Sequence, residues 1–61
     1  MTISQMRSSE LALELRRRQI TELLYTTDDH DVLIMLNEEM REIDRNLSHL
    51  RLELYGNLQR I

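Results

Sequence analysis

The 61-residue sequence contains no cysteine and no proline, and glycine occurs once. Without cysteine the chain cannot be cross-linked by disulfides, and without turn-forming residues it is poorly suited to a β-sheet, which needs many tight turns. Lysine is also absent, so all eight basic residues are arginine, and the net charge is −3. This acidic balance argues against a surface devoted to nucleic acid or to an anionic membrane.

The length limits the chain to one domain, because so short a chain buries only about 60% of its unfolded surface. No apolar run reaches the ~18 residues that a membrane span requires. The N-terminus lacks the charged and then apolar pattern of a signal peptide. We therefore expect a single domain over residues 1–61, located in the cytoplasm, for which association is the remaining route to stability.

The clearest pattern is an apolar seam between Val32 and Ile61. Its spacings alternate between three and four residues, which is the heptad signature of a helix with one buried stripe. The seam consists of Leu33, Leu36, Met40, Ile43, Leu47, Leu50 and Leu54. It predicts a helix over about residues 28–55 that can extend to 61, and Gly56 suits the position just past a helix end.

An earlier helix is predicted over about residues 3–25. Thr2 and Gln5 have the spacing of a capping box at its start. Its apolar side chains form two stripes, one with Met6, Leu13, Ile20, Leu23 and Leu24 and the other, nearly opposite, with Leu11, Leu15 and Tyr25. Two stripes indicate a second partner besides the neighbouring helix, as in a four-helix bundle.

A polar connection over about residues 26–30 separates the two patterns, and either Thr27 or Asp28 can cap the second helix. The predicted fold is therefore all-α: an antiparallel two-helix hairpin that dimerises into a four-helix bundle or coiled coil. A nearly continuous bent helix is the alternative.

The sequence Asp28-Asp29-His30-Asp31 is the only cluster of side chains that commonly bind metals. A calcium-binding EF-hand loop starting at Asp29 would need glycine and glutamate where Ile34 and Met40 stand. We therefore interpret the cluster as helix-capping residues and expect no metal, no cofactor and no catalytic residues. On this reading the protein is not an enzyme.

The one basic run is Arg16-Arg17-Arg18. Consecutive helical residues point about 100° apart, so these side chains do not form one patch. Glu14 has the spacing to pair with Arg17 and Arg18 along the helix. We expect a charge-balanced surface here, with contact to RNA as the alternative.

Two helices, a short acidic turn and about 60 residues resemble the plan of the plasmid copy-number regulator Rop, a homodimeric four-helix bundle that binds paired RNA loops. Small sporulation phosphatases are also helical hairpins. Their Ser-Gln-Glu-Leu-Asp signature would correspond here to Asn37-Glu38-Glu39-Met40-Arg41, in which arginine replaces the key acid. Small co-chaperones of secretion systems have a similar build.

The sequence thus predicts a small non-enzymatic protein–protein interaction module: a self-associating hairpin, homodimeric, acting as a regulator, adaptor or co-chaperone for another protein. Neither a membrane nor a small-molecule substrate is expected as a partner. The candidate partner surface comprises Leu11, Leu15, Tyr25, Leu58 and Ile61. The alternative is a Rop-like RNA-binding regulator that uses Arg16, Arg17 and Arg18.

Overall fold

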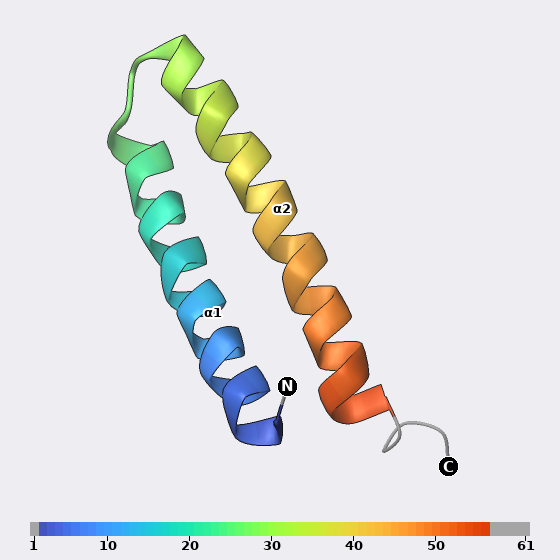
Figure 1. Ribbon diagram of the computed structural model, residues 1–61. Coiled ribbons are helices and arrows are strands. Elements are labelled where there is room, and N and C mark those ends of the chain that lie inside the picture. Colours follow the sequence, from blue (N-terminus) through green and yellow to red (C-terminus); the bar gives the residue numbers. More distant parts are fainter. Residues whose placement is uncertain (1, 57–61) are drawn as a thin grey trace.

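A computed structural model describes residues 2–56, and within them the chain forms two helices and no strand. Helix α1 spans Ile3–Thr26 and helix α2 spans His30–Tyr55. The helices run antiparallel and lie side by side along their length (Figure 1). The prediction of an all-α helical hairpin is confirmed.

Helix α1 begins with the capping box that the sequence predicts. The backbone N–H of Gln5 donates to Thr2 Oγ1 at 3.1 Å, and the backbone N–H of Thr2 donates to Gln5 Oε1 at 2.9 Å. These two bonds satisfy backbone donors that a helix start leaves without partners. At the other end Thr27 adopts an extended conformation, and its N–H closes the helix on the carbonyl of Leu23 at 2.9 Å.

Helix α2 is capped by Asp29, so the expectation that Thr27 or Asp28 would cap it is wrong. The Asp29 carboxylate accepts from the backbone N–H groups of Asp31 at 3.0 Å and Val32 at 3.4 Å. Thr27 already ends α1, and the three residues 27–29 are all needed to reverse the chain before α2 can start. The helix therefore begins at His30, two residues later than residue 28.

Gly56, at the end of α2, keeps right-handed helical dihedral angles (φ −58°, ψ −38°) and donates to the carbonyl of Leu52. A glycine that ends a helix commonly adopts the left-handed conformation instead. The geometry at this position therefore does not require glycine. The predicted extension to residue 61 lies outside the described residues.

The core lies where the apolar stripes of α1 and α2 meet. Ile20 of α1 is completely buried, and Leu36, Ile43 and Leu47 of α2 are nearly so. Three partly buried side chains pack against them: Leu13, Leu24 and Met40. The remaining members of the seam, Leu33, Leu50 and Leu54, are half-buried.

The hairpin measures 45 × 20 × 16 Å, with a radius of gyration of 14.2 Å. A compact domain of this length would have about 10.5 Å. A single layer of two helices cannot surround many side chains, and nine large apolar side chains among residues 2–56 are exposed. Neither helix in this part of the chain combines the length and apolarity needed to cross a membrane.

Candidate functional site

Two helices packed side by side leave two long flanks, each containing residues from both helices. Residues three or four positions apart on one helix share a flank. We call one flank the Arg51 face: Glu10, Glu14, Arg17 and Thr21 of α1 with Asp44, Ser48, Arg51 and Tyr55 of α2. We call the other the Ala12 face: Ser9, Ala12, Arg16, Gln19 and Leu23 of α1 with Glu39, Asn46, His49, Leu50 and Glu53 of α2. Met35 and Val32, four and seven residues before Glu39, extend this face toward the loop.

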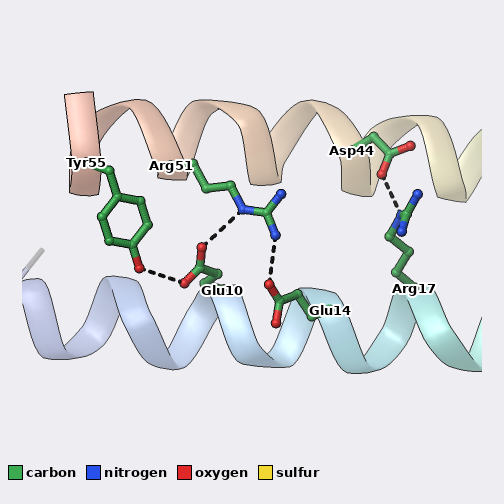
Figure 2. Close-up of polar contacts among 6 residues, drawn as sticks. All are labelled: Glu10, Glu14, Arg17, Asp44, Arg51 and Tyr55. Carbon is green, nitrogen blue, oxygen red and sulfur yellow. Dashed lines mark hydrogen bonds and ion pairs between the residues drawn. The ribbon is translucent and has the colours of Figure 1, made fainter. Parts of the chain in front are cut away.

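The Arg51 face is a ladder of ionic contacts between the helices (Figure 2). Arg51 bridges two carboxylates: its Nε donates to Glu10 Oε2 at 3.1 Å and its Nη2 donates to Glu14 Oε1 at 2.7 Å. The Tyr55 hydroxyl donates to Glu10 Oε1 at 3.1 Å. Closer to the loop between the helices, Arg17 Nε donates to Asp44 Oδ1 at 2.8 Å.

These contacts change the pKa values of the groups that donate. Hydrogen bonds to Glu14 and Glu10 raise the pKa of Arg51, so its guanidinium remains charged. The hydrogen bond to Glu10 raises the pKa of Tyr55, because the phenolate could not donate it. The ladder therefore holds α1 and α2 in register. Its arginine and carboxylate side chains bond to one another across the two helices.

One ion pair joins the two helices on the Ala12 face. Arg16 donates from Nε to Glu39 Oε2 at 2.5 Å and from Nη2 to Glu39 Oε1 at 3.1 Å, a two-pronged contact that suits guanidinium and carboxylate geometry. The hydrogen bond from Arg16 lowers the pKa of Glu39, and the hydrogen bond to Glu39 raises the pKa of Arg16. The pair is thus neutral as a unit.

The basic run is divided between the flanks. Arg16 points to the Ala12 face and Arg17 to the Arg51 face, and each is held by a carboxylate of α2. The predicted pairing of Glu14 with Arg17 or Arg18 is wrong, because Arg51 of the neighbouring helix takes Glu14. Among residues 2–56 Arg18 has no ion pair. Of the three candidate RNA contacts, Arg17 and Arg18 line one hollow on the Arg51 face, whereas Arg16 lies on the other flank.

An open apolar groove of about 470 Å³ lies on the Ala12 face near the open end of the hairpin. Small side chains from α1 form one wall. The groove is lined by Ser9, Ala12, Leu13, Asn46, His49, Leu50 and Glu53. The sequence does not reveal this groove, because its walls come from two segments far apart in the chain.

The candidate partner surface falls on the outward side of α1. Leu11 and Leu15 are exposed there, and Tyr25 is 87% exposed. Leu58 and Ile61 lie outside the described residues. Leu11 and Leu15 are four residues apart and so lie next to each other on the helix, whereas Tyr25 is almost three turns further along.

The acidic turn serves the helix start. Asp29 holds two backbone N–H groups, and the described residues, 2–56, contain no group of three or more histidine, cysteine, aspartate or glutamate side chains placed to hold a metal ion. His49, on α2, lies 3.9 Å from Glu53 of the next turn.

Comparison with known proteins finds no matching family model, no matching curated protein and no matching solved structure.

Proposed function

We propose that the chain is a non-enzymatic protein–protein interaction module of the cytoplasm. In this proposal the hairpin self-associates as a homodimer and acts as a small regulator, adaptor or co-chaperone for another protein. The observation that carries the proposal is the ratio of covered to uncovered apolar side chains: four are buried, whereas nine large ones among residues 2–56 are exposed.

Covering the exposed apolar side chains would stabilise the hairpin. Full burial of one large apolar side chain contributes about 1.5–3 kcal/mol, and the hairpin alone does not gain this free energy for the side chains that remain exposed. A second pair of helices packed on the first would cover several at once, as in four-helix bundles. The uncovered side chains face several directions, including the Ala12 face and the outward side of α1. One dimer contact would therefore leave apolar surface for a further partner.

The contacts of the Arg51 face support the non-enzymatic part of the proposal. Arg51 bonds to both Glu10 and Glu14, and these bonds hold α1 to α2. The division of the basic run supports protein binding over RNA binding. Arg16 and Arg17 would have to leave carboxylates to contact phosphates.

Thermal unfolding at a series of protein concentrations tests self-association. If folding and dimerisation are coupled, the midpoint followed by far-UV circular dichroism rises steadily over a roughly hundredfold increase in concentration, by mass action. A midpoint that does not change would overturn the homodimer.

Gel shifts with structured RNA at low salt test the alternative. We expect no retention. Retention that weakens steeply as salt is added would instead indicate phosphate binding with release of counterions.

A further inference from the structure

We infer that the Ala12 face is the surface on which a second copy of the chain packs. The inference rests on the proposed self-association and adds which side of the hairpin carries it. Two flanks and two outward helix sides are available, and they differ in charge, in side-chain size and in width.

The Arg51 face is the weaker candidate because it is already occupied by its own ionic contacts. Glu10, Glu14 and Arg17 of α1 are bonded to Arg51, Tyr55 and Asp44 of α2 across this flank (Figure 2). A second copy packed here would remove water from the whole ladder. Desolvation of ion pairs often costs more than their attraction returns.

The Ala12 face has the composition of a helix–helix contact. Ser9 and Ala12 are small and allow close approach, and the half-buried Leu13 and Leu50 form the groove beside them. Toward the loop the face continues with three exposed apolar side chains, Leu23, Val32 and Met35.

The α1 residues of this face form one continuous line. Ser9, Ala12, Arg16, Gln19 and Leu23 follow one another at intervals of three and four residues, so a neighbouring helix could lie along all of them. Arg16, the one charged member of this line on α1, is paired with Glu39 of α2, so a second copy packed here would desolvate one ion pair between the helices, compared with three ionic contacts on the Arg51 face.

The size of the face also fits. The accessible surface of the hairpin is 5235 Å². A stable protein–protein interface buries about 800 Å² on each partner, which is roughly 15% of that surface. The outward sides of α1 and α2 are only one helix wide, so they offer a narrower strip. A two-fold dimer uses the same patch on both copies, so one flank is sufficient.

A first pair of variants places a charge on each flank of α1. Ala12→Arg puts it on the proposed interface, and Thr21→Arg, its control, puts it on the Arg51 face; both positions are exposed in the hairpin. We expect Ala12→Arg to raise the dimer dissociation constant on the order of 100-fold, since a charge would be buried without a partner. Thr21→Arg should change it less than about threefold.

A second pair trims exposed side chains of α2 without adding charge, so that the hairpin itself is not strained. Met35 on the Ala12 face is 69% exposed, and Leu52 on the outward side is 67% exposed. Met35→Ala should weaken the dimer about tenfold, and Leu52→Ala less than about threefold. Circular dichroism at the same concentrations reports whether each variant keeps its helices.

The dissociation constants are measured by sedimentation equilibrium of the full chain. Suppose that the wild type is a dimer but that Thr21→Arg weakens it as much as Ala12→Arg does, or Leu52→Ala as much as Met35→Ala. The interface then lies on another side, and this inference is overturned while the proposed function stands. If the wild type is a helical monomer, the proposed function itself fails. If Ala12→Arg unfolds while Thr21→Arg remains a helical dimer, the Ala12 face is supported as the contact on which folding depends.

Discussion

Replacement of Ile20 by alanine probes the centre of the hairpin. Ile20 is the single side chain of α1 with no exposed surface, and it packs among Leu36, Ile43 and Leu47 of α2. Buried isoleucine-to-alanine changes cost about 2–5 kcal/mol, depending on how far the surroundings close the cavity. One layer of side chains covers this core, so partial closure is expected and the lower half of that range applies, about 2–3.5 kcal/mol.

For a domain of this size each kcal/mol lowers the melting temperature by about 4–8 °C, so Ile20→Ala should lower it by roughly 8–28 °C. The free energy of unfolding is measured by urea titration at one fixed protein concentration. The matched control is Ile34→Ala, because Ile34 is on the outward side of α2 and is 45% exposed. Its cost should stay within about 1 kcal/mol. Equal losses for the two variants, or a loss below about 1 kcal/mol at Ile20, would refute this description of the core.

Three further predictions concern the ends and flanks of the helices. The hydrogen bond from Arg16 lowers the pKa of Glu39 below the usual range of a glutamate. The pair therefore stabilises the fold above that range, and its contribution is lost as the pH falls through the lowered pKa. Acid titration of the unfolding free energy should be flatter for Glu39→Gln than for the wild type. Asp29→Ala should cost about 1 kcal/mol in urea unfolding by removing the cap of α2, with Asp28→Ala as the near-neutral control, and equal costs would contradict the assigned cap. Gly56→Ala should raise stability by about 0.4–1 kcal/mol, because the backbone there is right-handed helical and an added Cβ meets nothing within 4 Å; a loss in the same urea assay would count against that geometry.

The hairpin and its first cap could be predicted because they depend on local spacing. The capping box of Thr2 and Gln5 is complete within four residues, and the seam of α2 marks its inner side without reference to α1. The same local rules could not choose the second cap. Thr27, Asp28 and Asp29 all have side chains suited to the position, and the choice depends on how the chain reverses between the helices.

The pairing of charges across the helices could not be predicted from spacing along one helix. Glu14 has suitable neighbours at Arg17 and Arg18 in its own helix, yet it bonds to Arg51, which is 37 residues away. That choice depends on the register between α1 and α2, which the three-residue loop and the packing of Ile20 set together. The sequence does contain the partners, because Arg51 lies beside the seam of α2 and Glu14 beside the buried stripe of α1. Only an assumed register between the two helices would have paired them.

The width of the apolar stripe could be read from the sequence, but what covers it could not. Leu36, Ile43 and Leu47 are covered by α1, whereas Leu50 remains half-buried at the edge of the groove. One neighbouring helix covers only part of a wide stripe, because each helix presents a curved surface about 10 Å across. The uncovered part is the surface that the proposed dimer would bury.

Sedimentation equilibrium of the wild-type chain is the most direct test of self-association. We predict a mass of 14.8 kDa, twice the 7.4 kDa of one chain, at micromolar concentration and with fully helical circular dichroism. A stably folded, helical species of 7.4 kDa at that concentration would contradict it.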